Sequence, residues 1–164
     1  MTRVAWFNCS AGTAGDMTLA ALVDAGADQL RVGEILAALP IDDYALTFER
    51  TQRCGVASTR AIVAVHHHDE HHHDHHRPWR DIDAMLVAAE LPERVRDRAR
   101  SVFSLLAEVE GAIHGVPATD VEFHEVGSVD AIVDIVGVCA ALEALGVDRV
   151  VCSPITVGQG TVRA

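Results

Sequence analysis

Residues 128–146, SVDAIVDIVGVCAALEALG, form the stretch on which the fold depends. Apolar residues occupy nearly every side of this segment when it is drawn as a helix, and such a helix lies inside a protein. Asp134 interrupts its most apolar part, Ile132–Val136. A buried carboxylate is costly unless a hydrogen-bond donor or a metal compensates it. Asp134 is therefore either a structural partner, for example of a neighbouring backbone, or part of a functional site.

Strand and helix patterns alternate along the rest of the chain. Five segments are rich in β-branched and aromatic residues and predict strands: 3–9, 44–52, 58–65, 119–126 and 149–157. Four more predict helices: 16–27, 28–40, 80–90 and 92–115. Interleaved elements favour an α/β fold, here a mixed sheet packed with several helices in one domain over 1–164. The apolar seam expected on the long helix consists of Val95, Ala99, Val102, Leu106, Val109 and Ile113.

The composition excludes several classes of function. The net charge is −11, all 13 basic residues are arginine, and no basic run appears, which argues against a nucleic-acid partner. The missing lysine excludes a P-loop or a Schiff base. No apolar run is long enough to span a membrane. The four cysteines are far apart and are typical of reduced thiols, which predicts a cytoplasmic protein.

Residues 66–76, HHHDEHHHDHH, hold eight of the ten histidines. The tract is internal and carries acids, unlike an expression tag. We expect a disordered loop over 66–78, inserted between a strand and a helix, that either is merely solvated or collects metal ions. The match to H-x-x-E-H is what chance produces in so repetitive a tract. The predicted metal ligands are His66, His67, His68, His71, His72, His73, His75 and His76.

A second group of functional residues surrounds the start of the apolar helix. His124 and Glu125 follow a predicted strand, and Asp130 and Asp134 lie four residues apart on one helix face. Histidine with carboxylates suits a divalent metal or general acid–base chemistry. We predict His124, Asp130 and Asp134 as metal ligands and His124 and Glu125 as catalytic, with a structural role for Asp134 as the alternative.

A third candidate is the small-residue loop between the first strand and the first helix. It contains Ser10, Gly12 and Gly15 and is followed by Asp16 at the helix start. Backbone N–H groups at such a corner can bind an anion. A full G-x-G-x-x-G is absent, so a dinucleotide fold is not supported. The loop is either a tight turn with Asp16 as a helix cap or a binding site.

Four motifs in this order resemble the LarC family of nickel insertion proteins. They are FNCSAGTAGDM at 7–17, the His-rich insertion, AEVEGAIHG at 107–115 and FHEVGSVDAIVDIVG at 123–137. The resemblance covers essentially the whole chain but only the N-terminal portion of the longer family members. The chain also stops in an apparent glycine turn, GQG at 158–160, so we expect a further C-terminal portion.

The resemblance implies an enzyme, a nickel chelatase or cyclometallase of the lyase class. Its members insert nickel into pyridinium-3,5-bisthiocarboxylic acid mononucleotide, using CTP with manganese or magnesium, and so complete the nickel-pincer cofactor. The tract would then gather nickel, and the loop Gly12–Gly15 with Asp16 and the His124, Glu125, Asp130 and Asp134 cluster would form the functional surface. Within that surface we ourselves infer that Ser10, Gly12 and Gly15 bind the nucleotide and that His124, Glu125 and Asp16 are catalytic. The family often has Asp where this chain has Asn8, which is therefore left out. The implied partners are the mononucleotide, CTP, the C-terminal portion and, as an option, further copies of the chain.

Two other functions remain open from the residues. One is a nickel storage module in which only the tract acts and the remainder is scaffold. The other is a metal-dependent phosphohydrolase that uses Asp16, Asp130 and Asp134. Deleting 66–76 would abolish storage but leave insertion intact when nickel is ample, and a phosphohydrolase would release phosphate with magnesium alone.

Overall fold

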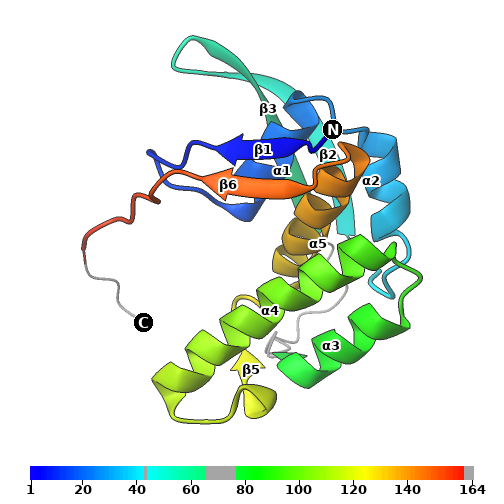
Figure 1. The fold of residues 1–164 in the computed structure, drawn as a ribbon, viewed down its shortest axis with the longest axis vertical. Helices are drawn as coiled ribbons and strands as arrows, with labels where there is room; N and C mark the ends of the chain where they lie inside the picture. The colour runs from blue at the N-terminus through cyan, green and yellow to red at the C-terminus, as the bar shows by residue number, and fades with distance from the viewer. Residues whose placement is uncertain (43, 66–76, 161–164) are drawn as a thin grey trace.

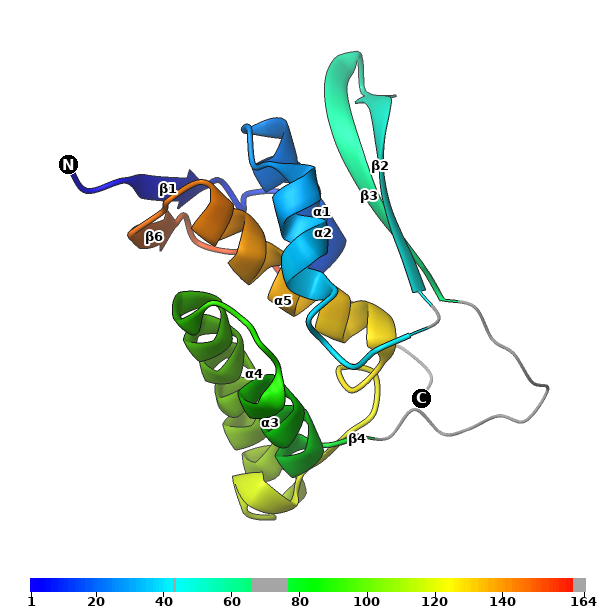
Figure 2. The ribbon, with the colours of Figure 1, turned by 90° about the vertical axis from the view of Figure 1, so that its right-hand side faces the viewer.

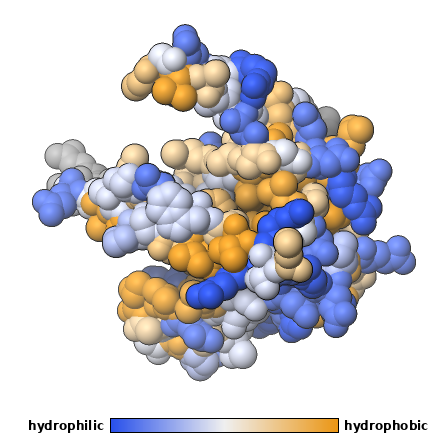
Figure 3. All heavy atoms as spheres, turned by 45° about the horizontal axis from the view of Figure 1, so that its top comes forward, coloured by the Kyte–Doolittle hydropathy of each residue, from blue (hydrophilic) through white to orange (hydrophobic). Residues whose placement is uncertain are grey.

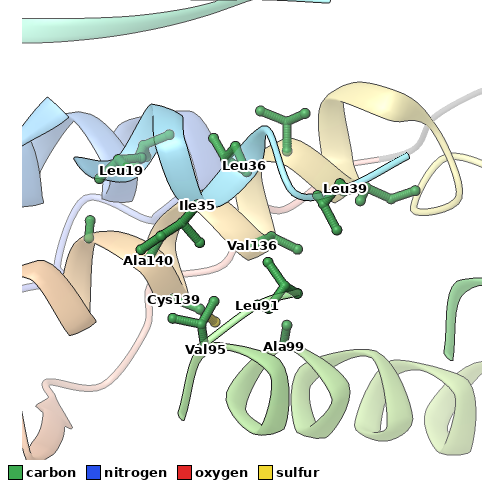
Figure 4. Close-up of a cluster of buried hydrophobic side chains, with 14 of the residues drawn as sticks. Leu19, Ile35, Leu36, Leu39, Leu91, Val95, Ala99, Val136, Cys139 and Ala140 are labelled. Carbon is green, nitrogen blue, oxygen red and sulfur yellow. The ribbon is translucent and has the colours of Figure 1, made fainter. Parts of the chain in front are cut away.

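Helix α5 (Val129–Ala144) is the central element of the computed structural model, which describes residues 1–42, 44–65 and 77–160. It packs against three other helices, α1, α2 and α4 (Figure 1). Figure 4 shows Leu19, Leu36, Val95, Val136 and Cys139 meeting in the resulting core, where each is at most 4% exposed. A helix that is apolar nearly all round is buried because partners cover it on several sides. This confirms the helix predicted over 128–146.

Helices α1 (Gly15–Asp24) and α2 (Gln29–Leu36) cover one side of α5, and a long hairpin lies beyond them (Figure 2). The hairpin consists of β2 (Tyr44–Arg53) and β3 (Val56–Val65). Cys54 and Gly55 connect the strands, with φ values of 49° and 80°. Positive φ at both positions belongs to the tight turns that match the twist of paired strands. The predicted hairpin is thereby confirmed.

Helix α4 (Glu93–His114) covers the other side of α5, and α3 (Trp79–Ala88) and a short 3-10 turn, η1 (Ala118–Asp120), pack against α4 (Figure 2). Trp79, Phe103 and Phe123 form an aromatic cluster there, with ring centres 6.1–6.5 Å apart. Arg100 joins the two helices through an ion pair of 2.6 Å with Asp83. Phe123 belongs to β5 (Glu122–Phe123), which pairs antiparallel with β4 (Arg77–Pro78). This small pair holds the segment that leads into α5.

The first and last strands bring the two ends of the described chain together. Strand β1 (Val4–Phe7) pairs parallel with β6 (Arg149–Cys152), so residues 145 positions apart lie side by side. Beyond the strands, the Cys9 amide donates to Ser153 Oγ, and the Thr156 hydroxyl donates to the Ser10 carbonyl. The loop after β1 is therefore fastened to residues 153–156.

The single mixed sheet that we predicted is wrong for the described residues, although the α/β class is confirmed. The described strands form three separate two-stranded pairs: β1 with β6, β2 with β3, and β4 with β5. Helices rather than other strands cover these pairs: the hairpin contacts α1 and α5, and β4 contacts α3. Strand propensity indicates an extended segment but does not identify its neighbour.

The buried face of α4 also differs from the prediction. Its buried residues repeat every four positions: Val95, Ala99, Phe103, Ala107 and Gly111. Three members of the predicted seam are exposed instead, Val102 at 40%, Val109 at 54% and Ile113 at 75%. The buried face includes Ala99, Ala107 and Gly111 because α4 lies close to its neighbours, which leaves room only for small side chains there. A Cβ on Gly111, for example, would stand 2.8 Å from the Val116 carbonyl oxygen.

Apolar patches between hydrophilic regions are visible on the face drawn in Figure 3.

Three further predictions need correction or fall outside the structure. The strand expected over 119–126 is β5 alone, preceded by the 3-10 turn. The strand expected over 149–157 ends at Cys152. Residues 66–76 lie outside the described residues, and 77–78, which we placed in the loop, form β4. Of the helices in the described part, none combines the length and apolar character needed to cross a membrane.

Candidate functional site

An open cleft of about 810 Å³ contains four of the predicted site residues. We call it the carboxylate cleft. Its walls come from the end of β3, from the loop after β5 and from the first two turns of α5. The lining residues are Val63, Val65, His124, Glu125, Val126, Ser128, Val129, Asp130, Ala131 and Asp134. The structure thus brings His124, Glu125, Asp130 and Asp134 together, as the sequence predicted.

A compact turn positions His124 and Glu125 at the cleft. The Ser128 hydroxyl and amide both donate to the Glu125 carbonyl, which closes the turn between β5 and α5. Gly127 is required inside it, since a Cβ there would stand 2.8 Å from the Phe123 carbonyl oxygen. The turn is therefore held by its own hydrogen bonds and by close packing, so it forms a rigid support for the two side chains.

Asp134 combines partial burial with two neighbouring negative charges. Burial raises the pKa of its carboxyl to about 6, helped by the negative charges of Asp16 and Asp130, while the backbone N–H of Asp16 acts in the opposite direction. Within the described residues its Oδ1 is buried without a hydrogen-bond partner. A carboxyl that titrates near neutral pH is suited to proton transfer and to binding a cation.

Gly15 explains how the first helix reaches this carboxylate. A Cβ placed on Gly15 would stand 2.7 Å from both Cβ and Oδ2 of Asp134. The first turn of α1 therefore lies directly against the Asp134 side chain, where the helix dipole favours negative charge. Asp16 lies in the same turn, and its Oδ1 accepts a hydrogen bond from the Met17 amide. The N-cap is Ala14, so the cap that we considered for Asp16 is wrong by two positions.

Ser10 and Gly12 lie on the other part of the glycine loop. The Ser10 carbonyl accepts from Thr156, and Gly12, with φ of +84°, would bring a Cβ within 3.6 Å of the Thr156 carbonyl oxygen. Neither residue lines the carboxylate cleft. Ser10 and Gly12 thus lie against Thr156, whereas Gly15 lies against Asp134. The nucleotide-binding role of these three residues stays a prediction.

Sequence reasoning missed a partner of His124. His114, the last residue of α4, lies with its ring centre 6.5 Å from that of His124 and with the ring planes at 22°. His114 is not among the site residues predicted from the sequence. The signal was that both histidines lie outside the tract with only nine residues between them along the chain, but the distance between them depends on how residues 115–123 fold.

The predicted metal site is assembled only in part. Among the residues of the three described ranges, no three His, Cys, Asp or Glu side chains are placed to hold a metal ion together. His124, Asp130 and Asp134 therefore share a cleft without forming a ready coordination shell. The eight tract histidines belong to 66–76, outside the described residues, and their metal role stays a prediction.

Comparison with known proteins identifies the family. The family model described as "Nickel insertion protein" matches residues 5–164. A "Putative nickel insertion protein" of Synechococcus sp. (strain JA-3-3Ab) is 45% identical over 98% of this chain, and one of the same name from Geobacter metallireducens is 44% identical over 98%. The "Pyridinium-3,5-bisthiocarboxylic acid mononucleotide nickel insertion protein" of Staphylococcus saprophyticus is 41% identical over 99%. No solved structure gave a significant match.

The chain spans about 40% of the length of these curated relatives. The match nevertheless includes the fold from β1, apart from Val4, to β6 and the whole carboxylate cleft. With this extent and this identity, the chain belongs to the nickel insertion protein family.

Proposed function

We propose that this chain forms the part of a nickel cyclometallase that receives nickel and the pyridinium mononucleotide and promotes formation of the nickel–carbon bond. The observation that carries the proposal is the Asp134 carboxylate, half-buried among like charges in a cleft that also contains an imidazole. Such an arrangement destabilises the fold and is retained where a substrate uses it. The name of the Staphylococcus saprophyticus relative supports the choice of substrate.

The cleft offers separate groups for the cation and for the proton. We assign nickel, as the substrate, to the His124 imidazole, since imidazole suits nickel, and the Glu125 and Asp130 carboxylates of the same cleft supply negative charge nearby. We assign the proton to Asp134, with Asp16 as the neighbouring charge. Bond formation replaces a pyridinium C–H bond with a C–Ni bond and releases one proton, which Asp134 accepts. A base whose pKa lies near the working pH is effective in that role.

The glycine loop fits a phosphate less directly than the sequence suggested. The Asp134 carboxylate already lies against Gly15 at the start of α1, and Asp16 adds a second negative charge in that turn. A phosphate placed there would be repelled unless a cation lay between them. We include CTP with magnesium or manganese as co-reactants of the whole activity. Within the described chain, this loop is the only segment that we assign to them, because the metal ion could lie between the phosphate and the two carboxylates. A cytoplasmic location completes the proposal, because the thiols suit a reducing compartment.

The test uses a family-length protein in which residues 1–164 replace the matched region of the Staphylococcus saprophyticus relative. Mass spectrometry follows formation of the nickel–mononucleotide product with nickel, CTP and magnesium present. We expect Asp134→Asn to abolish insertion while nickel binding persists, and His124→Ala to raise the nickel concentration required. Asp42→Asn, which changes an exposed carboxylate outside the cleft, is the matched control.

Two outcomes would refute the proposal. One is full insertion by the Asp134→Asn protein, and the other is a graft that inserts no nickel although it is folded. Loss of all nickel binding on deletion of 66–76, with the cleft variants unaffected, would favour the storage module. Phosphate release from nucleotides with magnesium alone would favour the phosphohydrolase, which the incomplete metal site among the described residues does not support.

A further inference from the structure

The pair of histidines at the end of α4 suggests a route for the incoming ion. His114 and His124 are both exposed, and their ring centres are 6.5 Å apart. With eight histidines in the tract, these two are the only others in the sequence. Their proximity depends on the nine residues between them, 115–123, so the structure of this segment decides whether the pair is rigid.

The turn between the two histidines is firmly built. Gly115 ends α4 with a left-handed φ of +71°, which reverses the chain. The Val116 amide donates to the Gly111 carbonyl, and the Trp79 amide donates to the Val121 carbonyl, so both ends of the turn are anchored. Gly111 and Val121 are buried. The pair is therefore positioned by the scaffold, as a binding site requires.

The ring separation is compatible with one shared metal ion. A metal bonded at about 2.1 Å to one nitrogen of each imidazole leaves the ring centres at most about 6.5 Å apart. The observed 6.5 Å is at this limit, which corresponds to a linear N–Ni–N arrangement, so the two exposed rings have to rotate toward each other for both nitrogens to bind one ion. From these observations we propose that His114 and His124 form a two-histidine nickel transfer site beside the carboxylate cleft. The proposal rests on the proposed function in taking nickel as the cargo.

The position of the pair suits transfer. His124 lines both the carboxylate cleft and a smaller pocket of about 240 Å³, which His114, Asp120 and Glu122 also line. An ion bound to the pair would be bound to His124, whose side chain also lines the cleft that contains the carboxylates. The acids around it raise the local cation concentration.

The small number of ligands also suits transfer. In the described part of the chain no group of three His, Cys, Asp or Glu side chains is placed to hold an ion together, so the pair contributes two protein ligands. A site with two protein ligands releases its ion more readily than a closed four-ligand site, and its open positions admit an incoming ligand. Such a site passes nickel on, whereas a closed site would retain it.

The test uses the full chain with the eight tract histidines changed to asparagine, so that His114 and His124 are the only imidazoles left. Nickel chloride alone is titrated while the imidazole resonances are followed by NMR. Nickel is paramagnetic and broadens the signals of its ligands, so both histidines should broaden together, with one ion per chain. His114→Ala should weaken the nickel response of His124 about tenfold or more, the loss of one of two metal–imidazole bonds. Asp120→Asn, in the same pocket, is the matched control and should change it far less, and magnesium should have no effect on either ring.

The opposite result is equally clear. An unchanged response of His124 in the His114→Ala protein, or no response of either ring to nickel, would overturn the transfer site. His114→Gln provides a second variant, and an unchanged amide spectrum confirms that each variant is folded. No nucleotide is present in this titration, so its failure would leave the insertion experiment untouched. Conversely, a graft that fails to insert nickel would not alter the binding measured here.

Discussion

The side chain of Asp134 on α5 lies against the backbone of Gly15 at the start of α1, so closely that a methyl group on Gly15 would stand 2.7 Å from its Cβ and Oδ2. This relationship joins two motifs that are 119 positions apart in the chain. It places a helix N-terminus beside a carboxylate whose pKa is raised to about 6. Two measurable consequences follow from this contact and its charges, and two more follow from the packing of α4 and of the core.

The contact predicts that Gly15→Ala destabilises the protein. The added methyl has no room, and overpacking of this kind costs about 1–3 kcal/mol. Gly33→Ala is the matched control, since Gly33 is exposed within α2 with nothing within 4 Å of the new Cβ. It should stabilise by about 0.5–1 kcal/mol through helix propensity. Urea denaturation measures both changes, and equal effects of the same sign would contradict the packing described.

The raised pKa predicts that Asp134→Asn stabilises the protein at neutral and higher pH. Because the carboxyl binds its proton more tightly in the fold, it favours folding most below its usual pKa of 3.8, and this contribution is lost as pH rises through about 6. Allowing for its partial exposure, we expect the variant to gain about 1–2 kcal/mol at pH 8. The gain should vanish near pH 4.

Denaturation of both proteins across this pH range measures the difference. Asp42→Asn serves as the control, because Asp42 is exposed and lies outside the cleft. A gain that stays constant with pH, or a loss of stability at pH 8, would show that the Asp134 carboxylate is compensated in the fold.

The four-residue repeat on α4 predicts unequal effects of two truncations. Phe103 is completely buried in the aromatic cluster, so Phe103→Ala should cost about 3–5 kcal/mol. Ile113 is 75% exposed, so Ile113→Ala should change stability by less than about 0.5 kcal/mol. Thermal or urea unfolding separates the two. A large loss for Ile113→Ala would mean that another surface covers this side of α4.

The cysteines are expected to divide into two classes of reactivity. Burial raises the pKa of the Cys139 thiol to about 11, so it stays protonated and inaccessible. Cys9 is also buried, whereas Cys54 and Cys152 are exposed. Alkylation of the folded protein followed by mass spectrometry should label Cys54 and Cys152 rapidly and the other two after denaturation. Rapid labelling of Cys139 would indicate that α5 is less enclosed than the core packing requires.

The local patterns of the sequence were sufficient for α5, for the hairpin and for four of the cleft residues. The run around Asp134 is apolar on every side, and Cys54–Gly55 is a two-residue turn between alternating strands. His124, Glu125, Asp130 and Asp134 are close in sequence, so one turn and one helical period are enough to bring them together. Properties of this kind depend on neighbours within a few residues, which periodicity and turn chemistry describe.

The remaining features depend on residues far apart in the chain. The contact of Gly15 with Asp134, the choice of the Ala- and Gly-rich face of α4, the separation of the strands into three pairs and the approach of His114 to His124 all arise when helices pack and turns close. Local propensity does not specify these partners, because side chains on several faces of a helix or strand are apolar enough to be buried. Close packing of the whole chain decides which face of a helix is buried, because only complementary faces fill the interior without voids. The same packing decides which carboxylate is desolvated.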